Sequence, residues 1–106
     1  MATQQIRKNA KEDVYIQVTN QHDPTASITV DSATFEVFDA DGTSVQTSAS
    51  ATISDNSTIS PDISGLVDTT DADFATNSWY EVVFVVTIGS EELHEVVHVE
   101  IVEESL

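Results

Sequence analysis

The alternation of apolar and polar residues over the last third of the chain constrains the fold more than any other feature. In the stretch SWYEVVFVVTI, every second residue from Tyr80 to Ile88 is aromatic or β-branched. A period of two places these side chains on one face of a β-strand. Gly89-Ser90 then predicts a tight turn, and the stretch EELHEVVHVEIVEE repeats the alternation. The apolar face of this second arm consists of Leu93, Val97, Val99 and Ile101.

Two details of this predicted hairpin bear on its surroundings. The first arm also carries Trp79, Val83 and Val85 on its other face, which is typical of a central strand with both faces covered. The second arm has a helical alternative, because Val96 and Val97 extend an apolar set that also fits helical spacing. The many valines favour the strand, since β-branched side chains lose rotamer freedom in a helix.

The same alternation in DVYIQVT and SITVDSATFEVF predicts earlier strands. Asp41-Gly42 predicts a turn into the weakly apolar TSVQTSASATI, which is typical of edge strands. From Ser54 to Asn77 the composition is polar, and we expect a long ordered connection. About seven short strands without helices predict an all-β fold, an antiparallel immunoglobulin-like β-sandwich. The apolar anchors expected in the connection are Ile59, Ile63, Leu66 and Phe74.

With 106 residues the chain has the length of one domain. We expect a basic N-terminal arm over residues 1–12, leading into the first strand, and a single sandwich over residues 13–104. There is no cysteine, so disulfide and thiolate chemistry are excluded. MATQQIRKNAK lacks the apolar segment of a signal peptide, and no run approaches the length of a membrane span. We therefore expect neither conventional secretion nor membrane insertion.

The charge distribution narrows the classes of partner. All 19 acidic residues follow residue 11, whereas the three basic residues, Arg7, Lys8 and Lys11, all lie in IRKNAK; the net charge is −16. An acidic surface repels phosphate backbones and anionic lipid, so we expect no nucleic-acid or membrane partner. Two explanations of the acidity stay open: adaptation to a salty medium, where screening shortens to about 3 Å near 1 M salt, or pairing with a basic partner.

Candidate chemical sites are weak. His94 and His98 form H-x3-H, but on a strand they lie about 13 Å apart, too far for one zinc ion. DADGTS, from Asp39, lacks the third acidic position and the distal glutamate of a calcium loop, so a β-turn is expected, with weak cation binding at Asp39 and Asp41 as the alternative. TTDADF is expected to be a solvated loop. No serine lies in a G-x-S-x-G turn. We expect no catalytic residue, no metal, no cofactor and no enzyme activity.

Two further motifs have a structural interpretation. Trp79-Tyr80 opens the two-sided strand and is expected in the core, with the Tyr80 hydroxyl bonded to an upstream backbone group as in a tyrosine corner. Exposure of Trp79 at an interface is the alternative. Asn56-Ser57-Thr58 matches the glycosylation sequon. Without a signal peptide, we expect this sequon to be unused.

Three segments together resemble a known class of protein. IRKNAKEDVYIQVTN, ATFEVFDADGTSV and WYEVVFVVTIGSEELHEVVHVEI are similar to the opening, second hairpin and closing hairpin of small immunoglobulin-like domains in tailed-virus particles. ISGLVD followed by WYEVVFVV also resembles fibronectin type III domains. The chain departs from the viral pattern at Asn9, where a turn glycine is common, and in lacking a glycine before Tyr80.

The resemblance implies a virion structural protein that decorates the capsid or sits at the neck, tail or baseplate. Its partners would be other virion proteins, in a homo-oligomer or bound to a lattice, and it would be assembled in the host cytoplasm. The acidic, lysine-poor composition then suggests a halophilic or marine host, including haloarchaeal tailed viruses. A free-standing binding or adhesion module is the alternative, with the contact surface on residues 54–77, and an acidic DNA mimic is a third.

IRKNAK suggests where such contacts lie. We expect Arg7, Lys8 and Lys11 to bridge to an adjacent acidic subunit, with Ile6 as the apolar anchor. The alternative is that the three cations only offset acids of the same molecule, such as Glu12.

Overall fold

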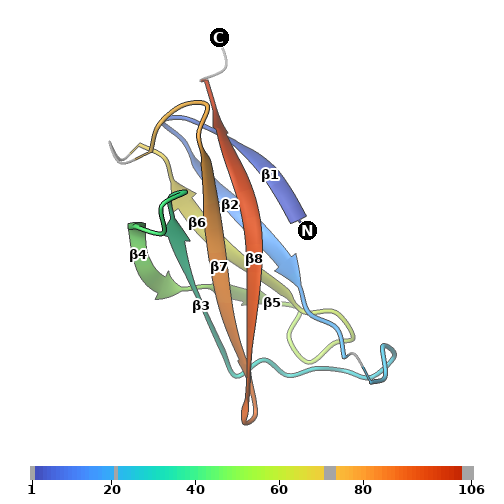
Figure 1. Cartoon of the computed structure of the whole chain (residues 1–106). Coiled ribbons are helices and arrows are strands. Elements are labelled where there is room, and N and C mark those ends of the chain that lie inside the picture. The colour runs from blue at the N-terminus through green and yellow to red at the C-terminus, as the bar shows by residue number, and fades with distance from the viewer. Residues whose placement is uncertain (1, 21, 71–73, 104–106) are drawn as a thin grey trace.

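The computed structural model describes residues 2–20, 22–70 and 74–103, which form two facing β-sheets (Figure 1). The larger sheet has the strand order β1-β8-β7-β3-β4 and the smaller one β2-β6-β5. Among these strands only β1 and β8 pair in parallel. The prediction of an all-β chain is confirmed. The strands are β1 (Ala2–Arg7), β2 (Lys11–Gln17), β3 (Ser32–Phe38), β4 (Ser44–Ser50), β5 (Thr52–Ser54), β6 (Asp62–Asp68), β7 (Trp79–Ile88) and β8 (Glu91–Val102).

The core lies between the two sheets and is built from the inward-facing residues of each strand. Phe35 of β3 and Phe84 of β7 are buried at its centre, with their ring centroids 6.1 Å apart. Valine and isoleucine from both sheets surround them. Each such side chain contributes roughly 1.5–3 kcal/mol when it is fully removed from water. The alternation in the sequence therefore predicted which faces become buried.

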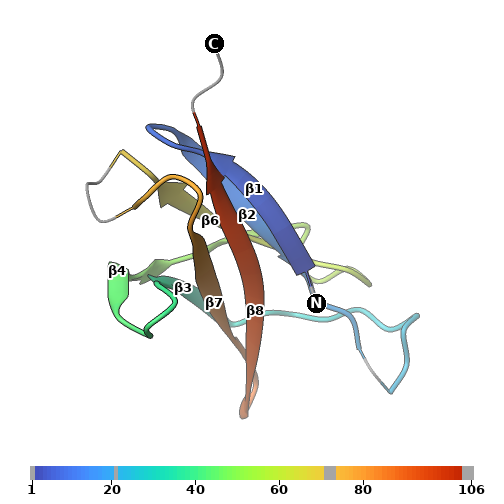
Figure 2. The same ribbon diagram turned by 45° about the horizontal axis from the view of Figure 1, so that its top comes forward.

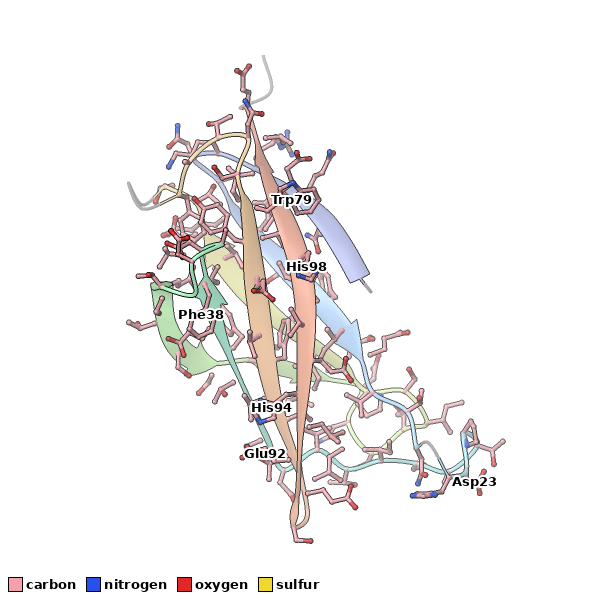
Figure 3. All side chains as sticks on the ribbon, viewed as in Figure 1. Asp23, Phe38, Trp79, Glu92, His94 and His98 are labelled. Atoms are coloured by element: carbon pink, nitrogen blue, oxygen red, sulfur yellow. The ribbon has the colours of Figure 1, made fainter. Side chains whose placement is uncertain are left out.

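The β7–β8 hairpin forms as predicted, over ten paired positions from Trp79 with Glu100 to Ile88 with Glu91. Gly89 adopts the left-handed conformation (φ 60°) that the two-residue turn requires. The strand interpretation of the second arm is thus confirmed over its helical alternative. The prediction that a further layer covers the outer face of β7 is wrong for the described residues. Trp79 is 48% exposed on that face and Val83 is only half-buried, so Trp79 does not belong to the core (Figure 3).

Residues 54–77 contain a strand that we had expected to be part of a connection. β6 is the central strand of the smaller sheet and pairs with β2 along its whole length. Its inward face is Ile63, Gly65 and Val67, and the glycine interrupts the apolar alternation in the sequence. A Cβ atom at Gly65 would lie 2.6 Å from the Phe35 ring, so the larger sheet fills the space that a side chain would occupy. Of the four expected anchors, Ile63 and Phe74 are buried, whereas Ile59 and Leu66 are exposed.

The expected basic arm is also a strand. Residues 2–7 form β1, which pairs in parallel with the C-terminal half of β8, from Ala2 with Val97 to Arg7 with Val102. Ile6 is fully buried in the core of its own chain. The strand was not predicted, because the residues around Ile6 are polar and the partner strand lies more than 90 positions away in the sequence.

The weakly apolar segments form edge strands, as predicted. β4 ends the larger sheet and β5 ends the smaller one. The Asp41-Gly42 turn between β3 and β4 also forms, with Gly42 at φ 84°. The Asp39 carboxylate accepts hydrogen bonds from the amides of Asp41 and Thr43, each at 2.9 Å, and so holds the turn.

Tyr80 lies at the start of β7 with its ring buried against Phe74, the ring centroids being 4.9 Å apart. Its hydroxyl oxygen accepts a hydrogen bond from the amide of Ala75 at 2.7 Å. The prediction of a bond to an upstream backbone group is confirmed. This bond ties the connection after β6 to the beginning of β7.

Replacing Tyr80 with phenylalanine should therefore lower the free energy of unfolding by about 1 kcal/mol, the usual net contribution of one such hydrogen bond. The ring and its packing stay, so the fold should be unchanged. Urea unfolding followed by tryptophan fluorescence measures the difference. The matched variant Tyr15→Phe removes a hydroxyl from a tyrosine that is 59% exposed, and should have almost no effect. Equal effects of the two variants would contradict a structural role for the Tyr80 hydroxyl.

Candidate interaction surfaces

The two histidines of H-x3-H lie on the strand β8 and make separate contacts. Nε2 of His94 lies 2.9 Å from Glu92, and Nε2 of His98 lies 3.4 Å from Glu81 on β7. Figure 3 shows the two histidines well apart along the strand. Within the described residues no three His, Cys, Asp or Glu side chains are grouped as metal ligands would be. That part of the chain also contains no helix long and apolar enough to cross a bilayer.

Carboxylates at the turns bind the chain's own backbone and hydroxyl groups. Hydrogen bonds from the hydroxyl and amide of Thr25 lower the pKa of Asp23. The same two bonds from Thr70 lower the pKa of Asp68, with smaller contributions from the charges of Lys11 and Lys8. The Asp39 carboxylate likewise accepts hydrogen bonds from the backbone amides of its own turn. The second Asp-x-Asp motif, at residues 71–73, lies outside the described residues.

The turn between β1 and β2 presents the basic residues, and Thr69 holds it in place. Thr69 is fully buried, and its hydroxyl donates to the carbonyl of Arg7 at 2.6 Å and accepts from the amide of Ala10 at 3.0 Å. Its own amide donates to the Ala10 carbonyl at 2.9 Å. Asn9 adopts φ 61°, a left-handed conformation that asparagine tolerates better than most residues. Asn9 thus stands where a turn glycine is common. Thr69 could not be identified from the sequence, because no local pattern distinguishes it from the other threonines.

The four residues expected to dock to a neighbour have different surroundings. Ile6 is enclosed by its own core and offers no surface. Nζ of Lys8 donates to the carbonyl of Thr69 at 2.8 Å, so this lysine supports the turn. Lys11 is exposed and lies opposite Asp68 in the β2–β6 register. Arg7 is exposed, and the ion pairs within the described residues do not include it. Of the predicted docking residues, Arg7 and Lys11 therefore form the accessible part.

A second surface lies on the side of the molecule where β1 and β2 meet. β1 has half as many residues as β8 and covers only its C-terminal half (Figure 2). Below the start of β1 the side is hollowed by a groove of about 430 Å³ between the tip of the β7–β8 hairpin and the segment that follows β2. Its apolar lining includes Ile28, Ile88 and Leu93. The sequence pattern gave no sign of this groove, because it results from the unequal lengths of two strands that pair across the whole chain.

The basic turn exposes charge, and the open side exposes an apolar lining and a strand edge. No known protein family matches the chain, and neither a curated protein nor a solved structure gives a significant match.

Proposed function

We propose that this chain is a non-enzymatic structural protein of a tailed-virus particle, a capsid decoration or a head or tail accessory protein that acts by protein–protein contacts. The assignment to a particle rests on the resemblance of IRKNAKEDVYIQVTN, ATFEVFDADGTSV and the closing hairpin to domains of such particles. The assignment to contacts rests on the surfaces described above.

The strand order of the two sheets supports the proposal, because we infer an immunoglobulin-like topology from it. When β2, β6 and β5 are taken as strands B, E and D, the strands β8, β7, β3 and β4 take the places of G, F, C and C′. With these labels the strand order is consistent with the two sheets of the immunoglobulin fold and an added C′ strand. The bond between Tyr80 and Ala75 at the start of β7 lies where a tyrosine corner lies in such domains. The described residues form eight strands, one more than the seven of the simplest immunoglobulin domain.

The observation that carries the contact mechanism is the position of Arg7 and Lys11. Both are exposed beside the turn that Thr69 holds in place. After Lys11 the chain contains acidic residues and histidines but no lysine or arginine. A neighbouring copy presents mainly carboxylates, which attract this turn. Each exposed ion pair is worth about 0.2–1 kcal/mol, so two pairs change the affinity of one contact roughly 2- to 30-fold.

The double variant Arg7→Gln/Lys11→Gln tests this mechanism while it leaves Lys8 bonded to Thr69. We expect a lower occupancy on isolated particles, measured by quantitative mass spectrometry, with a melting temperature close to that of the wild type. The control Asp41→Asn/Asp55→Asn also neutralises two exposed charges, at other turns, and should keep full occupancy. If the basic-turn variant loses stability in proportion to occupancy, the two cations serve only their own chain.

The same particles test the wider assignment. Proteins that co-purify with the chain, and the symmetry of its density, distinguish decoration of the whole shell from a ring at the neck or tail. A stable monomer that associates with no particle would favour the free-standing binding module, whose contact surface is expected on residues 54–77.

A further inference from the structure

The strand β8 has an open edge over its first half. β1 begins opposite Val97, so Glu91–Val96 pair with β7 on one side and with no described strand on the other. In an antiparallel pair, successive residues direct their backbone groups alternately to the two sides. The carbonyl of Val102 accepts the amide of Lys8 on the β1 side, whereas the amide of Ile101 donates to Ser78 on the β7 side. By this alternation Glu92 and His94 direct their amides and carbonyls to the open edge, and Val96 directs its amide there.

The open edge borders the groove described above. Ile28, Ile88 and Leu93 line the larger part, and Val18 and Val86 line a smaller hollow that also borders Leu93. β1 shows how a strand is seated on this side of the molecule, because its Ile6 points inward and is fully buried. A strand added below β1 would direct every second side chain into the groove in the same way. The volume of about 430 Å³ is within the range of ligand pockets.

The charge around the edge selects the occupant. Glu92 is exposed on the outward face of the open stretch, Glu91 and Glu95 are exposed on the face of Leu93, and neither lysine nor arginine follows Lys11 in the chain. Two copies paired edge to edge would bring these carboxylates together, which is a known way to prevent self-association of edge strands. A segment that carries lysine or arginine meets the opposite charge. The apolar groove requires that the alternate residues of the same segment be apolar.

We propose that Glu91–Val96 of β8 binds an extended segment of another protein in which apolar residues alternate with lysine or arginine. The segment adds to the larger sheet as a strand below β1, through backbone bonds to Glu92, His94 and Val96. Its apolar residues enter the groove and its basic residues lie on the outward face, nearest to Glu92. Main-chain bonds supply affinity in this mode and the side-chain pockets supply selectivity. The inference goes beyond the proposed function, since it concerns the chemistry of a partner and does not depend on the particle.

The probe is the capped hexapeptide acetyl-Val-Lys-Val-Lys-Val-Lys-amide, and the readout is amide hydrogen exchange by NMR on the whole chain. In the free protein the amides of Glu92, His94 and Val96 should exchange faster than those of Leu93 and Glu95, which bond to β7. The peptide should slow exchange of the amides of Glu92, His94 and Val96 at least about tenfold when its concentration is roughly ten times its Kd. A peptide with glutamate in place of lysine, and one N-methylated on alternate residues, should have no such effect.

The variant His94→Pro removes the amide that faces the edge and leaves the β7 pairing intact, since proline is tolerated where the N–H of an edge strand faces solvent. It should bind the lysine peptide at least about tenfold more weakly, a loss of about 1.4 kcal/mol. His94→Ala keeps the amide and should therefore bind more tightly than His94→Pro. If the proline variant fails to fold, the N-methylated peptide decides the question.

Several results would overturn the inference. The first is an unchanged exchange rate at saturating peptide. The second is equal binding of the glutamate peptide or of a folded His94→Pro variant. The third is a free protein that dimerises in sedimentation experiments and already protects the same amides. None of them would bear on whether the chain is found in particles, so failure here and failure of the proposed function are distinguishable.

Discussion

Replacing Gly65 with valine should lower the free energy of unfolding by about 3 kcal/mol. The Cβ atom alone would lie 2.6 Å from Cγ of Phe35 and 2.8 Å from both Cδ atoms, so the ring must move before any larger side chain fits. Overpacking of this kind costs typically 1–3 kcal/mol and sometimes more. Phe35 has little room to move, because it is 4% exposed and packs on Phe84. Urea unfolding of the purified variant measures the loss.

Two controls isolate the steric cause. Ser64→Val lies next to Gly65 on the outward-facing side of β6, and should change the stability by less than about 0.5 kcal/mol. The double variant Phe35→Ala/Gly65→Val should be more stable than the sum of the single effects implies, by at least about 1 kcal/mol, because the cavity left by the ring accommodates the valine. Additive effects in this cycle would show that the Phe35 ring is not the obstacle.

Replacing Thr69 with valine should lower the free energy of unfolding by about 2–4 kcal/mol. The change keeps the shape of the side chain but deprives the Arg7 carbonyl and the Ala10 amide of their bonds to the buried hydroxyl. A polar group left unsatisfied in this way costs about 1–3 kcal/mol. The β1–β2 turn should also loosen, which NMR exchange of the Ala10 amide would detect.

Thr69→Ser is the matched control for this variant. It keeps the hydroxyl and removes one methyl group, so it should cost only about 0.8 kcal/mol. A valine variant that is as stable as the serine variant would mean that the turn does not depend on the hydroxyl. In that case the fixed position of Arg7 and Lys11 would need another cause.

The parts of the fold that could be predicted are those in which a strand shows its own alternation. The β7–β8 hairpin, the buried face of β3 and the edge strands β4 and β5 follow from residue spacing and turn residues alone. The bond of the Tyr80 hydroxyl followed from an aromatic residue at the start of a central strand. Each of these depends on neighbours in the sequence, which a local pattern records.

The parts that could not be predicted depend on groups far away in the chain. β6 was missed because Gly65 leaves space for Phe35 of the opposite sheet, and a missing side chain weakens the alternation. β1 was missed because its parallel partner is at the other end of the chain. Trp79 was misplaced because its strand pattern does not tell whether a further layer covers the sheet.

By itself, the sequence determined that the chain folds into strands, which side of most strands faces the core, and that its surface is acidic apart from one turn. These are local properties, because the pleat of a strand assigns alternate residues to opposite faces whatever the partner. Only the tertiary structure decided that β1 stops halfway along β8, that Thr69 holds the basic turn, and that a groove lies beside an open edge. These depend on the lengths and registers of strands that meet across nearly the whole chain, which no short stretch of residues records.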